Sequence, residues 1–81
     1  MITRKAKILG VKNVIHFVQA ANKIPCSIDI HYGRKCLDAK SFIGVMTINI
    51  KNEFLLEIHT DDPKEIEIID RELREFIIEE Q

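Results

Sequence analysis

The segment formed by residues 26–39 constrains the fold more than any other part of the chain. Residues 26–32 alternate between apolar and polar side chains, which is typical of a strand with one buried face. Gly33 and Arg34 follow, and a two-residue turn with glycine in first place is a preferred hairpin connection. Residues 35–39 then return as a second strand. This hairpin predicts two cross-strand pairs on one face, His31 with Cys36 and Asp29 with Asp38.

The first half of the chain otherwise contains a strand and a helix. Residues 1–9 alternate in the same way and predict a half-buried strand. Asn13 is a good N-cap, and a helix is predicted from there through residue 23, where Pro25 prevents its continuation. Its apolar residues recur at helical spacing on one stripe, made of Val14, Phe17, Val18 and Ala21.

The second half adds two helices and a strand. Ser41 can cap a short helix that runs to about residue 48, with Val45 and Ile48 as its core pair, and residues 53–60 predict a strand. In the last helix Asp62 is the predicted cap, Pro63 takes the first helical position, and Glu65 completes a capping-box arrangement. Its apolar stripe is predicted to contain Ile66, Ile69, Leu73, Phe76 and Ile77.

This order of elements predicts one α+β domain over residues 1–81. We expect an open-faced sandwich, with a four-stranded antiparallel sheet and three helices on one of its faces. The contents of 46% hydrophobic and 31% charged residues are ordinary for a globular protein. The apolar runs are far shorter than the ~18 residues of a membrane span. With no signal peptide and two cysteines, the chain is expected in the cytoplasm.

The charges are divided unevenly along the chain. Residues 1–51 hold nine basic and two acidic residues, a net charge of +7, and residues 52–81 hold three basic and eleven acidic residues, a net charge of −8. Mutual attraction in the folded chain explains this, and a basic docking face for an acidic partner is the alternative. Nucleic-acid binding is not expected, because the lysines are not interleaved with aromatic residues.

Two segments at a fixed spacing resemble a known family. Residues 18–23 read VQAANK and residues 40–46 read KSFIGVM. Together they resemble HPr, the phosphocarrier of the bacterial sugar phosphotransferase system, and the resemblance covers nearly the whole chain. It implies the same order of strands and helices.

The resemblance fails at the histidine that carries the phosphoryl group in HPr. That histidine belongs to a Gly-Leu/Ile-His-Ala-Arg-Pro motif at the start of the first helix, and here residues 10–15 read GVKNVI. Alignment on the helix places Gly10 at the histidine position, whereas alignment on the glycine of the motif places Lys12 there. No Arg-Pro pair is present. We therefore expect neither an enzyme nor a cofactor. His16 is the nearest imidazole, either an exposed helix residue or a relocated phosphoacceptor.

The short helix provides the residues that the resemblance implies are functional. In relatives of HPr, a dedicated kinase phosphorylates the serine that corresponds to Ser41, although a helix cap alone also explains this serine. The family binds enzyme I, IIA domains, the kinase and a catabolite regulator through the neighbouring apolar residues. The expected partner-binding residues are Lys12, Lys40, Phe42, Ile43 and Met46, with Lys51 as a further cation at the rim.

The histidines and cysteines elsewhere are expected to be structural. His31, Cys36 and the Asp29/Asp38 pair should share the outer face of the sheet with His59. Their spacing matches no closed structural zinc site, so we expect a polar surface and no bound metal. Cys26 alternates in step with the inward-facing side chains of its strand and is predicted to be a core thiol. The two cysteines are therefore expected on opposite faces of the sheet. The prediction is a non-catalytic, cytoplasmic, partner-binding HPr-like protein, with a His16 phosphocarrier as the alternative.

Overall fold

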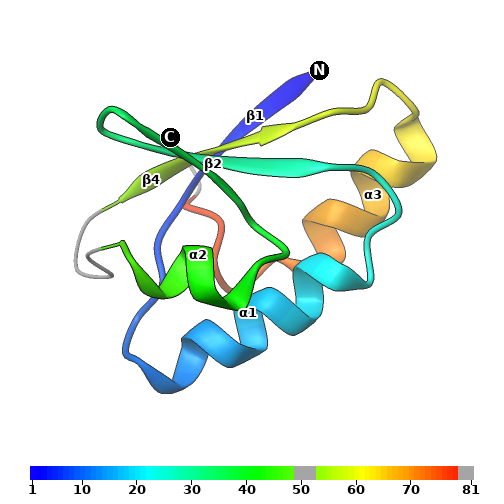
Figure 1. Ribbon diagram of the computed structural model, residues 1–81. Helices are drawn as coiled ribbons and strands as arrows, with labels where there is room; N and C mark the ends of the chain where they lie inside the picture. The colour runs from blue at the N-terminus through cyan, green and yellow to red at the C-terminus, as the bar shows by residue number, and fades with distance from the viewer. Residues whose placement is uncertain (49–52, 79–81) are drawn as a thin grey trace.

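The computed structural model describes residues 1–48 and 53–78 and contains an open-faced α+β sandwich (Figure 1). The sheet has four strands in the order β1-β4-β2-β3, and every neighbouring pair is antiparallel. The strands are β1 (Ile2–Ala6), β2 (Ile28–Tyr32), β3 (Lys35–Asp38) and β4 (Phe54–Ile58). The helices α1 (Lys12–Asn22), α2 (Phe42–Met46) and α3 (Pro63–Glu72) cover one face of the sheet. The predicted α+β architecture is confirmed.

The predicted hairpin forms with the expected register. β2 pairs with β3 so that His31 is opposite Cys36 and Asp29 is opposite Asp38. Gly33 takes a φ of 59° in the turn between the strands. This left-handed conformation is one that glycine adopts at little cost, which explains the residue at this position.

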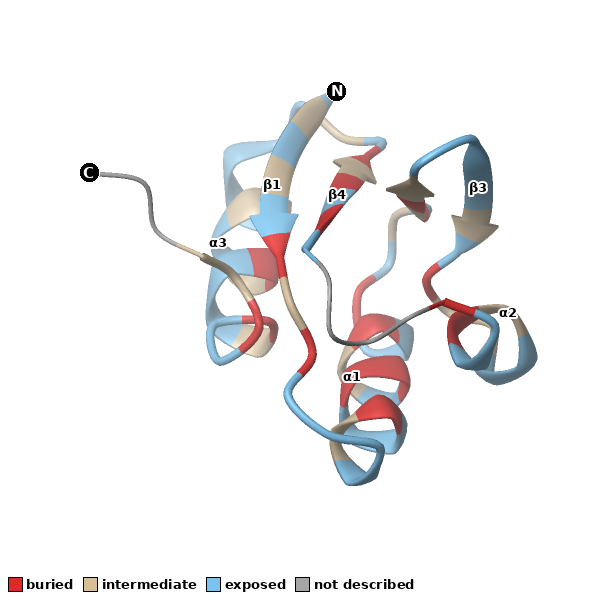
Figure 2. Ribbon diagram, turned by 90° about the vertical axis from the view of Figure 1, so that its left-hand side faces the viewer, coloured by how far each residue is buried: buried red, intermediate tan, exposed pale blue. Residues whose placement is uncertain are grey.

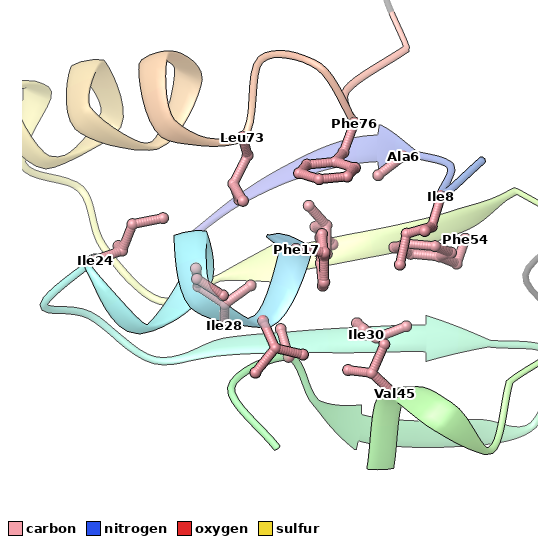
Figure 3. Packing of buried hydrophobic residues seen from close by; sticks show 14 of the residues in the cluster. Ala6, Ile8, Phe17, Ile24, Ile28, Ile30, Val45, Phe54, Leu73 and Phe76 are labelled. Atoms are coloured by element: carbon pink, nitrogen blue, oxygen red, sulfur yellow. The ribbon is translucent and has the colours of Figure 1, made fainter. Parts of the chain in front are cut away.

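One continuous hydrophobic cluster lies between the helices and the sheet. The predicted stripe of α1 is buried, and its Phe17 lies at the centre of the cluster (Figure 3). The ring of Phe17 makes edge-to-face contacts with Phe54 of β4 and Phe76, with centroid distances of 5.9 and 5.2 Å. These contacts hold α1 against the sheet and against the segment that follows α3.

The segment that follows α3 pairs with the outer edge of β1 at the end of that strand. The backbone N–H of Lys7 donates to the carbonyl of Phe76 at 2.9 Å, and that of Ile78 donates to the carbonyl of Lys5 at 2.8 Å. Ala6 and Ile77 form an antiparallel bridge between these bonds. The residues expected to extend the last helix therefore pair with β1 instead, and α3 ends at Glu72.

Three local predictions about helix starts and strand ends are wrong. The α1 helix begins at Lys12 after Val11, and the Asn13 side chain donates backward to the carbonyl of Leu9 instead of capping the helix. At the start of α3, Asp62 accepts from Lys64 N–H as predicted, but its own N–H donates to the Thr60 hydroxyl, which takes the bond expected from Glu65. The strands are also shorter than predicted, because residues beyond the paired ones are still buried and so continue the alternating pattern without strand pairing.

None of the helices within residues 1–48 and 53–78 combines the length and the apolar content that a membrane crossing needs.

Candidate partner-binding face

The five-residue helix α2 divides its apolar residues between the core and the surface. Val45 is fully buried, and Ile48, just after the helix, is 6% exposed, as predicted for the core pair. The side chains of Phe42, Ile43 and Met46 are 44%, 79% and 46% exposed. All three expected apolar binding residues therefore lie at the surface, on a helix that is anchored from its other side.

Lys40 fastens the start of α2 to the end of α1. Its ammonium group donates to the carbonyl of Ile24 at 2.5 Å, and its own carbonyl accepts from the Asn22 side-chain amide at 3.1 Å. The side chain is half-buried, whereas Lys12 at the start of α1 is exposed. Of the expected cations at the rim, Lys12 is thus at the surface, Lys40 links α2 to the end of α1, and Lys51 lies outside the described residues.

Ser41 caps α2 as predicted. Its hydroxyl accepts a hydrogen bond from the backbone N–H of Gly44 at 3.2 Å, which satisfies one of the free donors of the first helical turn. The residue is in the extended conformation, with φ −98° and ψ 112°, and is partly buried. The side-chain oxygen is therefore fixed at the boundary between the helix and the solvent.

The start of α1 contains no imidazole. Residues 9–15 hold no histidine, and the helix follows Gly10, whose φ is 89°. Leu9 and Val11, on either side of this glycine, are 69% and 64% exposed. Exposed apolar side chains therefore flank the glycine that precedes α1.

His16 lies inside α1 and is exposed. Two residues after the buried Val14, it projects about 200° away from that side chain around the helix axis. The N–H groups of Asn13 and Val14 at the start of the helix donate to the carbonyls of Gly10 and Val11. The imidazole thus projects from the side of the helix opposite its buried stripe.

Ile15 extends the apolar surface from α2 onto α1, which the sequence analysis missed. Asn22 contacts Lys40 at the start of α2, so this side of α1 faces α2, and the two helices lie side by side (Figure 2). Ile15 precedes Asn22 by seven residues, which is within about 20° of two full turns, so it lies on the same side. It is 48% exposed. We define the apolar face as Val11, Ile15, Phe42, Ile43 and Met46. The sequence signal that could have revealed Ile15 is its place outside the buried stripe of the helix, where a polar residue is usual.

The two cysteines are separate free thiols. Cys36 is exposed on β3, and its sulfur lies 3.9 Å from Nε2 of His31. Cys26 precedes β2 and packs half-buried against the core, so the prediction of a core thiol holds only in part. Burial raises the pKa of the Cys26 thiol, and the negative charge of Glu65 raises it further. Cys26 is therefore held in its protonated form.

Comparison with known proteins identifies the family. The model of the PTS HPr component phosphorylation site matches residues 9–78, which is most of the chain. The chain belongs to the HPr family. HPr proteins are phosphocarriers and not catalysts, and they interact with other proteins of the phosphotransferase system and with regulators. A search of curated protein sequences gave no match.

Two solved structures share the HPr fold with this chain. The first is HPr-C-His from Thermoanaerobacter tengcongensis, which is 24% identical over 93% of this chain and 92% of that chain, with a TM-score of 0.71. The second is the catabolite repression containing protein Crh of Bacillus subtilis, which is 23% identical over 91% of this chain and 88% of that chain, with a TM-score of 0.63. The Crh structure is a domain-swapped, intertwined dimer.

Proposed function

We propose that this chain is a single-domain, cytoplasmic HPr-family protein that carries no phosphoryl group on histidine and acts by binding a protein partner. The partner is a component of the phosphotransferase system, a kinase or a transcriptional regulator. The observation that carries the proposal is the combination of a helix start without histidine and an exposed apolar surface beside it. These two features support binding by contact and give no support to phosphoryl transfer through a histidine at the start of α1.

The apolar face suits protein binding on physical grounds. Six of the eight large apolar side chains exposed in residues 1–48 and 53–78 are Leu9 and the members of this face. Contiguous exposed apolar groups of this kind mark interaction sites in monomeric proteins. Phe42 offers an aromatic anchor, and Lys12 offers a cation at the rim. Lys40 supports the face by holding α2 against α1.

Ser41 is the proposed control point of the face. A phosphate on its hydroxyl would add close to two negative charges beside Phe42, on the surface that the partner covers. The hydrogen bond that Gly44 N–H donates to the Ser41 hydroxyl would give way to bonds that the N–H groups of the same helix start donate to phosphate oxygens. Phosphorylation is therefore expected to change partner affinity without unfolding α2.

A phosphotransfer assay separates this proposal from the alternative of a His16 carrier. The full chain is incubated with phosphoenolpyruvate and enzyme I, and an HPr that has its active-site histidine serves as the positive control. We expect acid-labile phosphate on the control and none on this chain. Acid-labile phosphate on this chain that disappears in the His16→Gln variant would refute the proposal and establish the alternative.

A binding assay with matched variants tests the apolar face. Purified enzyme I, IIA domain, HPr kinase and the catabolite regulator are each titrated into the chain by calorimetry. Ile43→Ser is expected to weaken binding at least about tenfold, the size of an interface hot spot of 1–2 kcal/mol. Leu55→Ser is the control, because Leu55 is also exposed, at 40%, but lies on the opposite face of the sheet. Equal losses in both variants would contradict the proposed surface.

A further inference from the structure

The outer face of the sheet gathers metal-ligating side chains from its two central strands. Asp29 of β2 lies directly opposite Glu57 of β4. His59 follows two residues after Glu57 and projects to the same face, because side chains alternate along an extended chain. The backbone N–H of His59 donates to the carbonyl of Ser27 at 3.0 Å, which holds this residue to the β2 side of the sheet.

The donor atoms of these three residues are already close to metal-ligand geometry. Nε2 of His59 lies 2.8 Å from Oδ2 of Asp29 and 3.6 Å from Oε1 of Glu57. One donor atom from each of the three residues lies within 4.8 Å of the others. In a tetrahedral zinc site with bonds of ~2.1 Å, ligand atoms are about 3.4 Å apart. The two measured separations bracket this value, so small side-chain rotations create room for an ion.

The charge of the cluster also favours a cation. Asp38, Asp29 and Glu57 form one row across three neighbouring strands, and like charges directly opposite each other destabilise a sheet. In the part of the chain that the structure describes, Asp29 pairs with His59, and Glu57 pairs with both His31 and His59. Two neighbouring carboxylates thus converge on His59. A divalent ion would compensate both.

We propose that Asp29, Glu57 and His59 form a binding site for a divalent transition-metal ion, with Zn²⁺ as the best fit. An imidazole nitrogen with two carboxylate oxygens suits zinc, whereas calcium and magnesium prefer oxygen ligands alone. Water completes the coordination, because the ligand side chains are 25–38% exposed. The proposal reverses the expectation from the sequence that no metal binds on this face of the sheet.

His31 has a supporting role at this site. Its Nε2 lies 3.0 Å from Oε2 of Glu57, the oxygen that the zinc ligand Oε1 leaves available. A hydrogen bond to this second oxygen would orient the carboxylate toward the ion, as outer-shell groups do at metal sites. The sulfur of Cys36 lies 3.9 Å from Nε2 of His31, the same nitrogen that contacts Glu57, and the proposed ligand set does not include it.

Titration with zinc chloride alone tests the site on the full chain. Calorimetry is expected to show one equivalent of Zn²⁺ bound per chain. His59→Gln is expected to weaken binding at least about tenfold, because one of three ligands is lost. His16→Gln is the matched control, since this exposed histidine lies on α1 on the helix side of the sheet, and it should bind zinc like the unmodified chain.

Cobalt substitution identifies the ligands directly. Co²⁺ bound by Asp29, Glu57 and His59 should show visible bands without a thiolate charge-transfer band. A charge-transfer band that disappears in Cys36→Ser would overturn the ligand set, and so would unchanged zinc affinity in His59→Gln and Asp29→Asn. Absence of saturable binding would overturn the site itself. Circular dichroism confirms that each variant is folded, and none of these outcomes bears on the partner-binding face, which lies across the sheet.

Discussion

Replacing Phe17 by leucine tests the packing that positions the partner-binding face. Phe17 is fully buried in α1, and its ring meets Phe54 and Phe76 edge to face, at interplanar angles of 81° and 90°. Leucine retains an apolar side chain but removes the aromatic partner of both rings. The substitution therefore isolates the contacts that join α1 to the sheet and to the segment after α3.

The expected loss of stability follows from these two ring contacts. Each edge-to-face pair contributes about 0.5–1.5 kcal/mol beyond the area that it buries, so the loss is about 1–3 kcal/mol. A domain of this size has a total unfolding free energy of roughly 4–12 kcal/mol, of which this is a large share. At about 4–8 °C per kcal/mol, a loss near 2 kcal/mol lowers the melting temperature by about 8–16 °C.

Urea denaturation followed by circular dichroism measures this change. Ile15→Ala is the control on the same helix, because Ile15 is 48% exposed, and such surface substitutions change stability by about 0.5 kcal/mol or less. A double-mutant cycle of Phe17→Leu with Phe76→Leu then isolates one ring pair. If Phe17→Leu is no more destabilising than Ile15→Ala, the assignment of Phe17 to the centre of the core is refuted.

Two further predictions concern a thiol and a turn. Because burial and Glu65 raise the pKa of Cys26, its alkylation at about pH 8 should be slower than that of the exposed Cys36, and Glu65→Gln should accelerate it. Equal alkylation rates at both cysteines would contradict the shift. The same raised pKa means that the stability of the fold declines as the pH rises past the ordinary thiol pKa. Gly33→Ala should cost about 1–2 kcal/mol in urea denaturation because of the φ of 59°, whereas Gly44→Ala places a Cβ at an ordinary 3.5 Å from Ser41 inside a helix and should be neutral or stabilising by up to about 1 kcal/mol. A larger loss for Gly44→Ala than for Gly33→Ala would reverse this interpretation.

The hairpin shows what local sequence determines well. Gly33 sets the turn, and the alternation on both sides sets the faces, so the pairing of His31 with Cys36 follows without knowledge of the rest of the fold. The stripe of α1 is equally local, because helical spacing alone separates its buried residues from His16. Such features depend on neighbours within about ten residues along the chain.

Features that depend on distant contacts were predicted poorly. The apolar spacing after Glu72 continues through Phe76 and Ile77, but the chain leaves the helix there to pair with β1, which lies 70 residues earlier. One short-range prediction also failed: Asn13 has the chemistry of an N-cap, yet its amide donates to the carbonyl of Leu9, four residues earlier. In both cases a local preference gives way to a hydrogen bond that the sequence pattern does not reveal.

The sites show the same division. The exposure of Phe42, Ile43 and Met46 agrees with the expectation from the resemblance, but the bond from Lys40 to Ile24 requires the turn after α1 to be in place. The approach of His59 to Asp29 depends on where β4 lies in the sheet. A histidine 30 residues away from its carboxylate partner carries no local signal of that contact.

The covering of β1 by residues 76–78 has a consequence for synthesis on the ribosome. β1 is translated before residues 76–78, so the carbonyl of Lys5 and the N–H of Lys7 find their partners only when those residues have been translated. During that interval the edge is open to a strand from another nascent chain. Once residues 76–78 are in place, the carbonyl of Lys5 and the N–H of Lys7 can no longer pair with a second chain.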